Sequence, residues 1–185
     1  MARRDVKSEM IRGAGELLAT HGVQGTSFAL VLEATGAPRG SIYHHFPGGK
    51  HELVLAAVAA VGSAVTSLID IAEADSPQEL VTTFVRGWRS TLTSGRFERG
   101  CTIAAASQGA EDELDIRTAA HDVFTEWRQA LARALVRSGT DPSDAEDHAA
   151  LLIAAVEGAL LMGRAAHSEE IFDVLERRLP RLLGL

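Results

Sequence analysis

Residues 36–53, GAPRGSIYHHFPGGKHEL, combine a Gly-Ala-Pro turn, an arginine, a tyrosine, two adjacent histidines and a Gly-Gly-Lys sequence. The segment is too polar for an ordinary core helix and too short for a domain. Upstream, Ser27 is a helix-capping residue and Gly36 marks a helix end. Pro38 suits the first turn of a second helix, which is expected to run to about His45. The sequence therefore predicts two short helices joined by a three-residue turn, which are the dimensions of a helix-turn-helix.

The net charge of the 185 residues is −7, which at first argues against nucleic acid as a partner because phosphate binding needs positive charge. The charge is, however, unevenly distributed. Residues 1–53 hold six Lys and Arg against five Asp and Glu, whereas the remaining residues hold twelve against twenty. Four of the seven histidines also lie in residues 1–53. One face of the N-terminal segment can therefore be positive while the rest of the chain is acidic.

The composition, 46% hydrophobic and 23% charged, is that of a soluble globular protein. The N-terminus lacks the apolar run of a signal peptide, and charged residues interrupt the longest apolar stretches, so we expect a cytoplasmic protein that does not enter a membrane. The single Cys101 cannot form an intramolecular disulfide or a cysteine-rich zinc site.

Apolar residues recur every three or four positions, and no stretch alternates as a strand does, so the sequence predicts an all-α protein of about nine helices. Gly13 and Gly15 weaken the first helix by roughly 1 kcal/mol each relative to Ala, so packing must hold it, and Gly22 is expected to stop it. The helices are expected at about 4–20, 27–35, 38–45, 50–74, 77–93, 101–108, 113–138, 142–167 and 168–183.

We divide the chain into a three-helix head, residues 1–49, and a helical body, residues 50–185, which begins with the long connecting helix. In a helix-turn-helix the N-terminal residues of the second helix face the base edges in the major groove. Here these residues are Arg39, Gly40 and Ser41. An arginine offers two donors to guanine, a glycine lets the backbone approach closely, and a serine hydroxyl both donates and accepts.

The neighbouring polar residues are expected to contact the sugar-phosphate strands. The free N–H groups at the start of the long helix would add to a phosphate clamp there. Ile42 and Phe46 are expected to pack inward. The expected backbone contacts are Thr26 or Ser27, Tyr43, His44, His45 and Lys50.

With these residues in place, the segment resembles the DNA-binding head of the tetracycline-repressor (TetR/AcrR) family of bacterial transcriptional regulators. The resemblance covers about residues 8–55. It departs from the family at Ala37-Pro38, where many members have a small polar cap before the recognition helix. GAPRGSIYHHFPGGK, with GCTIAAA and VEGALLMGR farther on, is similar to the subgroup that includes lincomycin- and flavonoid-responsive repressors. The matching residues are Thr26, Gly36, Gly40, Ile42, Tyr43, His45, Phe46, Lys50 and Leu53.

The resemblance implies a sequence-specific DNA-binding regulator, a homodimeric repressor released from a palindromic operator by a small hydrophobic effector. It also implies that the acidic body binds the effector. Aromatic residues with a few polar groups are typical of such a pocket, although the same residues are equally compatible with a plain core. Glu157 could instead pair with Arg164 or lie at the dimer interface. The candidate pocket residues are Phe84, Trp88, Cys101, His121, Phe124, Trp127, Glu157 and Met162.

Dimerisation is expected through the last two helices. The helix at 142–167 is rich in Ala and Gly, which lets a partner helix approach closely, and two such helices from each copy would form a four-helix interface. Recognition helices about 34 Å apart would then match successive major grooves. The candidate interface residues are Leu152, Ala155, Val156, Ala159, Gly163, Leu175 and Leu179.

Other function classes fit the sequence less well. His44, His45 and His51 could suggest a metal site, but adjacent histidines diverge on a helix, so we expect neither metal nor cofactor. The acidic run EDELD, residues 111–115, suits a solvated helix start better than a catalytic carboxylate pair. A helical carrier or enzyme remains the alternative, yet no nucleophile–base arrangement or phosphate loop supports an enzyme. A purely protein-binding bundle does not account for Arg39 and Tyr43.

Overall fold

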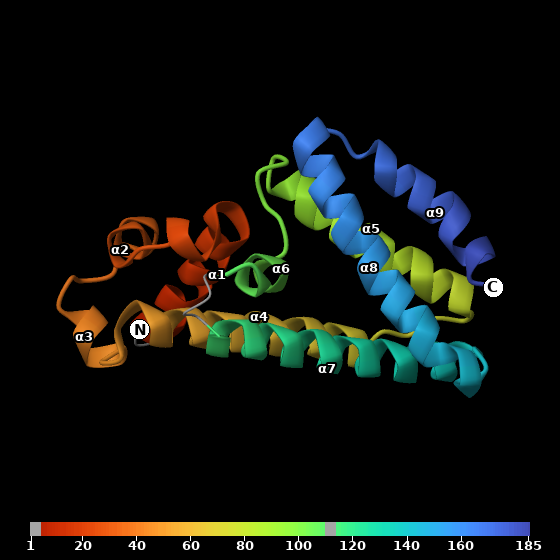
Figure 1. Ribbon diagram of the computed structural model, residues 1–185, viewed down its shortest axis with the longest axis horizontal. Coiled ribbons are helices and arrows are strands. Elements are labelled where there is room, and N and C mark those ends of the chain that lie inside the picture. Colours follow the sequence, from red (N-terminus) through yellow and green to blue (C-terminus); the bar gives the residue numbers. More distant parts are fainter. Residues whose placement is uncertain (1–4, 110–113) are drawn as a thin grey trace. The chain divides into compact units, whose positions relative to one another are not determined.

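The computed structural model describes residues 5–109 and 114–185, and within them it contains nine α-helices and no β-strand (Figure 1). The all-α prediction is confirmed, and most helix boundaries agree to within a few residues. The helices are α1 (Val6–Gly25), α2 (Phe28–Thr35), α3 (Ser41–His45), α4 (Gly49–Asp70), α5 (Pro77–Ser94), α6 (Thr102–Ser107), α7 (Leu114–Ser138), α8 (Pro142–Ala166) and α9 (Glu170–Leu182).

The helices belong to two compact units. The first comprises residues 1–63 and 102–123, and the second comprises residues 64–101 and 124–185. The first unit therefore contains α1, α2, α3 and α6, and the second contains α5, α8 and α9. The long helices α4 and α7 each contribute their first part to the first unit and their remainder to the second.

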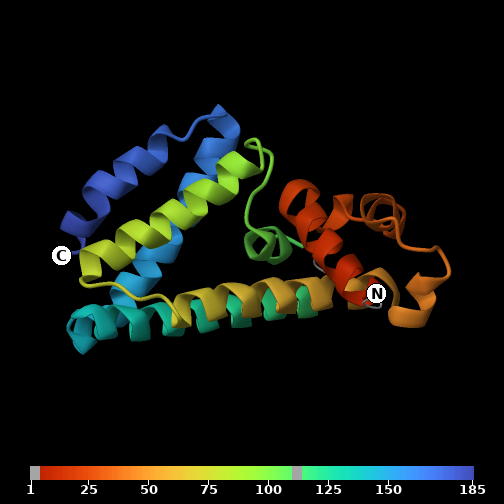
Figure 2. The ribbon, with the colours of Figure 1, turned by 180° about the vertical axis from the view of Figure 1, so that it is seen from behind.

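In the first unit α1 packs against α2 and α6 (Figure 2). The two glycines of α1 are explained by this packing. A Cβ at Gly13 would lie 2.6 Å from the Thr35 methyl group, and one at Gly15 would lie 3.2 Å from a methyl group of Val61. The cost of glycine to the helix is thus offset by close contact with its neighbours. Within this unit α4 and α7 also approach closely, since a Cβ at Gly62 would lie 2.7 Å from a Val123 methyl.

The first helix extends farther than predicted but changes direction where predicted. Gly22 has φ 69° and ψ −177°, so it interrupts the helical backbone inside α1. The short piece that follows continues to Gly25, whereas the sequence predicted an end near Thr20. Gly22 therefore interrupts the helix as predicted, but the three residues after it form one more helical turn before Thr26.

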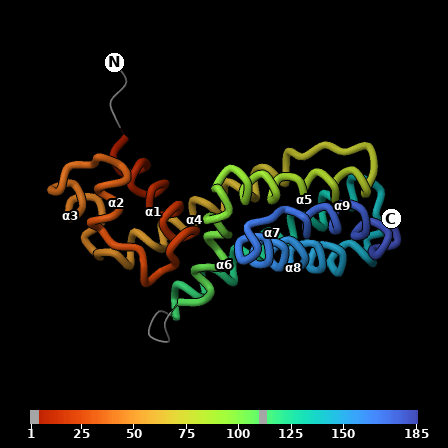
Figure 3. The backbone as a smooth tube through the Cα atoms, turned by 90° about the horizontal axis from the view of Figure 1, so that it is seen from above, coloured from red at the N-terminus to blue at the C-terminus, as the bar shows by residue number. Residues whose placement is uncertain are grey.

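In the second unit α5 packs against α8 and α9, and α8 packs against α9 (Figure 3). A Cβ at Gly163 of α8 would lie 2.5 Å from Leu92 of α5, so these two helices are closely apposed. The half-buried guanidinium of Arg89 on α5 forms ion pairs of 2.9–3.0 Å with three carboxylates of the last helix and its N-cap. These carboxylates belong to Glu169, Asp173 and Glu176.

The helices of the second unit begin with side chains that cap their first turns. The hydroxyl of Ser76 accepts the N–H of Glu79, and the Glu79 carboxylate accepts the N–H of Asp75. Asp141 caps α8 by accepting the N–H of Ser143 at 2.9 Å. The hydroxyl of Ser168 accepts the N–H of Glu170 at the start of α9. A capping side chain bonds to a backbone N–H group only a few residues away, so such caps can be predicted from the sequence.

The long helix α4 ends at Asp70, four residues before the predicted end near residue 74. The guanidinium of Arg137 donates to the carbonyl oxygens of Ile69 and Asp70, at 3.5 and 3.1 Å. Arg133 also pairs with the Asp70 carboxylate at 3.0 Å. Side chains of α7 therefore satisfy the last carbonyls of α4 in place of a further helical turn.

Two helices, α4 and α8, are long and apolar enough to cross a bilayer by length and composition alone. Core helices of soluble proteins pass the same test. Both helices bury an apolar face within the protein, for example Val54 of α4 and Val156 of α8, each fully buried. Their apolarity is thus accounted for in part by packing.

Candidate nucleic-acid interface

The helix α2 has well-defined ends. The Ser27 hydroxyl accepts the N–H of Leu30 at 3.3 Å, so Ser27 is the N-cap, as predicted. At the other end Gly36 adopts a left-handed conformation (φ 63°, ψ 22°), and its N–H donates to the carbonyl of Leu32 at 2.8 Å. A left-handed residue after the last helical turn is the usual glycine stop signal. The turn toward α3 therefore begins where the sequence places it.

The position of Pro38 differs from the prediction. The helix α3 begins at Ser41, so Pro38 lies in the turn before it rather than in its first helical turn. The Pro38 carbonyl accepts the main-chain N–H of Ser41 at 2.9 Å and its hydroxyl at 2.5 Å. A main-chain carbonyl thus holds the N–H and the hydroxyl of the first helical residue. Because its hydrogen is used within the chain, Ser41 is left to accept rather than donate.

Arg39 and Gly40 lie exposed immediately before α3. Gly40 has an ordinary right-handed backbone (φ −68°, ψ −17°). A Cβ placed on Gly40 would have no heavy atom of the described chain within 4 Å, apart from its immediate neighbours. Neither backbone strain nor packing therefore requires glycine here, and the surface beside Gly40 is open to a partner.

The two sides of α3 differ in character. Ile42 and the following Phe46 are buried, at 4% and 0% exposure, and the Lys7 ammonium group lies 5.7 Å from the Phe46 ring. Tyr43 is 76% exposed, and its ring meets the edge of Phe28 of α2 at 6.5 Å. His44 is exposed and His45 is half-buried, with ring centroids 4.9 Å apart. The predicted inward and outward residues are thus separated as expected.

Thr26 is placed differently from the prediction of a phosphate contact. It is 1% exposed, and its hydroxyl donates to the carbonyl of Gly22 at 2.8 Å. Its own N–H donates to the carbonyl of Val23. Thr26 therefore closes the bend at the end of α1, and of the two predicted alternatives, Thr26 or Ser27, it is the less accessible to a phosphate. Ser27, which is half-buried, keeps that role as a candidate.

The start of α4 offers fewer free N–H groups than the sequence suggested. The N–H of Gly48 donates to the Glu52 carboxylate at 2.8 Å, and the N–H of Gly49 donates to the Phe46 carbonyl at 3.0 Å. Two of the four N–H groups of the first turn are thus bonded within the chain. The expected phosphate clamp is therefore reduced to the Lys50 ammonium group with the remaining N–H groups.

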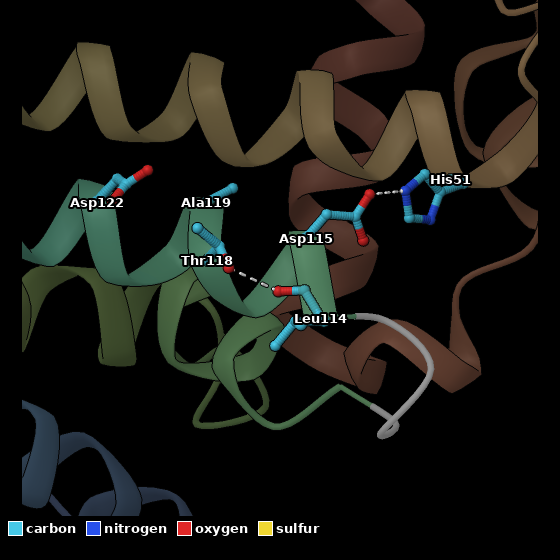
Figure 4. A pocket seen from close by; sticks show the side chains of 6 residues that line it. All are labelled: His51, Leu114, Asp115, Thr118, Ala119 and Asp122. Atoms are coloured by element: carbon cyan, nitrogen blue, oxygen red, sulfur yellow. Dashed lines mark hydrogen bonds and ion pairs between the residues drawn. The ribbon is translucent and has the colours of Figure 1, made fainter.

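An ion pair that the sequence did not reveal lies next to this clamp. His51 of α4 meets the Asp115 carboxylate of α7, at the edge of an open depression (Figure 4). The hydrogen bond from His51 holds the pKa of Asp115 below its ordinary value. No local sequence signal joins residues 64 positions apart, and Asp115 was expected only to be solvated at a helix start. The other acidic residues of that run, 111–113, lie outside the described part of the chain.

In the second unit four of the expected pocket residues form an aromatic cluster. Phe84 contacts Trp88, Trp88 contacts Trp127, and Phe124 contacts Trp127, with centroid distances of 6.2, 5.7 and 5.6 Å. Trp127 is fully buried, and the other three are half-buried. Cys101 of the same unit is also buried. The structure thus brings the predicted aromatic residues together.

Two residues predicted for the pocket are exposed in the described structure. His121 is exposed on α7, and Met162 is 57% exposed on α8. The residue types of His121 and Met162 suit a pocket, but the side of the helix on which each one lies faces solvent.

Glu157 of α8 is largely buried, and its Oε1 atom has no hydrogen-bond partner among the described residues. Burial raises the pKa of this carboxyl to about 7, and a hydrogen bond with Cys101 lowers it in part. A carboxyl in such surroundings is costly to ionise unless a donor or a cation meets it.

The predicted dimer interface needs correction. Five of its seven residues are buried inside the chain, because they form the face of α8 and α9 that packs within the second unit. Apolar residues of α8 that remain exposed include Leu151, Ala154, Gly158, Leu161 and Met162. Ala155 and Leu175 are half-buried. The helix is apolar on two faces, and the sequence alone could not tell the inner face from the outer one. The five buried residues are Leu152, Val156, Ala159, Gly163 and Leu179.

Known protein families match both parts of the chain. The model of bacterial regulatory proteins of the tetR family matches residues 10–57, and the model of the LmrA/YxaF-like transcriptional regulator C-terminal domain matches residues 77–178. An uncharacterized HTH-type transcriptional regulator of Mycobacterium tuberculosis is 34% identical to this chain, over 96% of this chain's length and 93% of the relative's length. The HTH-type transcriptional regulator LmrA of Bacillus subtilis is 27% identical over 99% of both chains.

Solved structures have the same fold. A TetR transcriptional regulator from Legionella pneumophila matches 98% of this chain and 99% of its own, with a TM-score of 0.82 and 23% identity. A cysteine mutant of the TetR family regulator CifR, complexed with a 26-bp double-strand operator DNA, covers 97% of this chain and 98% of its own, with a TM-score of 0.76 and 23% identity. The helix-turn-helix geometry, both family models and the full-length relatives agree, and the chain belongs to the TetR family of transcriptional regulators, with an LmrA/YxaF-like C-terminal domain.

Proposed function

We propose that this TetR-family regulator is a homodimeric repressor whose two heads bind a palindromic operator and are released by a small hydrophobic effector. The observation that carries the DNA-binding part is the two-sided helix α3. Its apolar residues Ile42 and Phe46 are buried, while Arg39, Gly40 and Tyr43 are open to a partner. The complex of CifR with operator DNA supports this reading by similarity of fold.

The exposed residues divide into two roles. Arg39 offers a planar fork of donors to base edges, and Gly40 lets the backbone come close, so these two read sequence. Ser41 adds an acceptor. Tyr43 and His44, together with Lys50 at the start of α4, bind the sugar-phosphate strands and fix the orientation of the head.

Dimerisation is assigned to the outer face of α8 and its continuation on α9. Leu161 is 70% exposed, and Val174 and Leu182 on α9 are also exposed. An apolar face of this kind on two adjacent helices suits a two-fold helical interface. Leu161→Glu should therefore give a monomer with weakened operator binding. Leu68→Glu, at a similarly exposed position of α4, serves as the matched control.

Dimerisation is measured by sedimentation at the concentration used for DNA binding. A Leu161→Glu protein that remains dimeric would contradict the assigned interface. If Leu68→Glu dissociates the dimer instead, the interface lies elsewhere.

The second unit supplies the effector site, supported by the aromatic cluster around Trp127. We retain residues 1–49 as the DNA-binding domain and residues 50–185 as the effector-binding and dimerisation domain. TetR-family proteins are soluble DNA-binding regulators, so we place this one in the cytoplasm and assign it no enzymatic activity. An effector need contribute only about 1 to 3 kcal/mol of coupling to weaken operator binding 5- to 150-fold.

The function is tested by selecting, from genomic DNA, the fragments that bind the purified full-length protein. Repression predicts enrichment of a small set of fragments that share an inverted repeat and overlap a promoter. Enrichment of fragments without a common sequence would contradict sequence-specific binding. Increased transcription from the selected promoter in the presence of the protein would show an activator instead.

A further inference from the structure

Glu157 is an unusual group for the interior of a helical domain. Its Oε1 atom is buried and has no hydrogen-bond partner within residues 5–109 and 114–185, whereas buried polar groups in proteins are normally paired. Its one identified side-chain partner is the thiol of Cys101. A thiol is a weak donor and supplies a single hydrogen, so it cannot satisfy both carboxylate oxygens.

We propose that Glu157 binds the protonated amine of a hydrophobic effector. This inference rests on the proposed function and names the chemical class of its ligand. A neutral apolar ligand at this site would bury the unpartnered oxygen further, which is unfavourable. An ammonium group donates a charge-assisted hydrogen bond, about twice as strong as a neutral one, and it balances the charge of the carboxylate.

The aromatic cluster belongs to the same unit as Glu157. Trp88 and Phe124 are half-buried and border the fully buried Trp127, so their rings are partly accessible. Aromatic faces contact apolar groups and also attract cations through their negative quadrupole. A compact hydrophobic amine therefore matches both the carboxyl and the aromatic cluster in chemical character.

The two tryptophans also report on binding. The chain contains only two tryptophans, Trp88 and Trp127, and they lie in contact with each other, so fluorescence excited at 295 nm, where tyrosine absorbs little, comes from this cluster. The probes are 1-adamantanemethylamine, which is protonated at neutral pH, and 1-adamantanemethanol, which has the same shape and no charge. Neither absorbs at the excitation wavelength of tryptophan.

Titrations of the full-length protein compare these two probes. We expect the wild-type protein to bind the amine at least tenfold more tightly than the alcohol. Glu157→Gln keeps the size of the side chain but removes its charge, and it should abolish this preference. Asp147→Asn, at an exposed carboxylate of the same helix, should retain it. If the glutamine variant does not fold, as judged by circular dichroism, Glu157→Met provides the same comparison.

Several results would overturn the inference. These are equal affinities of the wild-type protein for amine and alcohol, a preference that survives Glu157→Gln, and failure of both probes to bind. Operator affinity of each variant without probe is measured in parallel. Normal operator binding without an amine preference refutes the ligand class alone, whereas absence of operator binding by the wild-type protein refutes the proposed function.

Discussion

The hydroxyl of Thr102 donates a buried hydrogen bond of 3.1 Å to the main-chain carbonyl of Gly15. This bond joins α6 to α1 across 87 positions of the sequence. At the same residue α1 also lies close to α4, since a Cβ on Gly15 would come within 3.2 Å of a methyl group of Val61. The preceding residue, Cys101, belongs to the second unit and hydrogen-bonds Glu157 of that same unit. Each of these two adjacent residues is thus bonded to a helix of its own unit.

Replacing Thr102 by valine tests the contribution of this bond. The variant keeps the shape of the side chain but loses the donor, so unfolding should become easier by about 1 kcal/mol, a typical value for a neutral hydrogen bond. Urea denaturation measures the change. Thr102→Ser, which keeps the hydroxyl, should recover the bond while losing one methyl contact. Valine with the stability of the wild-type protein would show that the bond contributes nothing.

Gly40→Ala tests whether a partner approaches the main chain before α3. The added methyl meets no atom of the described chain beyond its neighbours, and the backbone is right-handed, so folding should be unaffected or slightly favoured. Operator affinity should nevertheless fall, because the methyl would stand between the main chain and the base edges. We expect a loss of about tenfold, roughly 1.4 kcal/mol.

The control is Gly87→Ala on the exposed side of α5, where a Cβ also meets nothing. It should leave both thermal stability and operator affinity at or above the wild-type values. Unchanged operator affinity of Gly40→Ala would mean that the DNA does not come close to this glycine.

The pKa of Glu157 predicts a specific dependence of stability on pH. Its value is about 7 in the folded protein, against an ordinary 4.5, so between these two pH values the unfolded chain releases the proton while the folded chain keeps it. The free energy of unfolding therefore falls as pH rises through this window, by up to about 3 kcal/mol, and levels off above it. Below pH 4.5 the group is protonated in both states and contributes no pH dependence.

The difference between the wild-type protein and Glu157→Gln isolates this effect from other titrating groups. Asp115 and Glu169, whose pKa values are lowered by their ion pairs, act at more acidic pH and in the opposite direction. The glutamine variant should gain stability relative to the wild-type protein between pH 5 and pH 8. A stability difference that is the same at both pH values would contradict the raised pKa.

The features predictable from sequence are those set by neighbours along the chain. Ser27 caps α2, Gly36 stops it, and Asp141 caps α8, because each acts within a few residues of its own position. The aromatic cluster could also be anticipated, since large apolar residues on amphipathic helices are drawn to the interior.

The features that sequence missed depend on contacts between distant segments. The pairing of His51 with Asp115 and the closing of the α4 end by Arg137 have no local signal. Thr26 has the residue type of a phosphate ligand, but its burial depends on how the chain bends at Gly22. Five of the seven residues predicted for a dimer interface instead pack inside the second unit, which the sequence did not show because both faces of α8 are apolar. The inner face of α8 is the one that packs against α5 and α9, and the sequence of α8 alone does not show which face that is.

The central claim is that the head recognises DNA by sequence through Arg39 and by charge through Lys50. The most direct measurement is the affinity of full-length protein for a selected genomic fragment and for a scrambled one, between 50 and 200 mM salt. Wild-type affinity should fall with a slope of about −0.9 per phosphate contact. Arg39→Ala should lose about 1 to 3 kcal/mol of discrimination between the fragments, whereas Lys50→Ala should weaken both alike and reduce the slope by about one. Equal wild-type affinity for the two fragments, or identical effects of the two substitutions, would contradict the account.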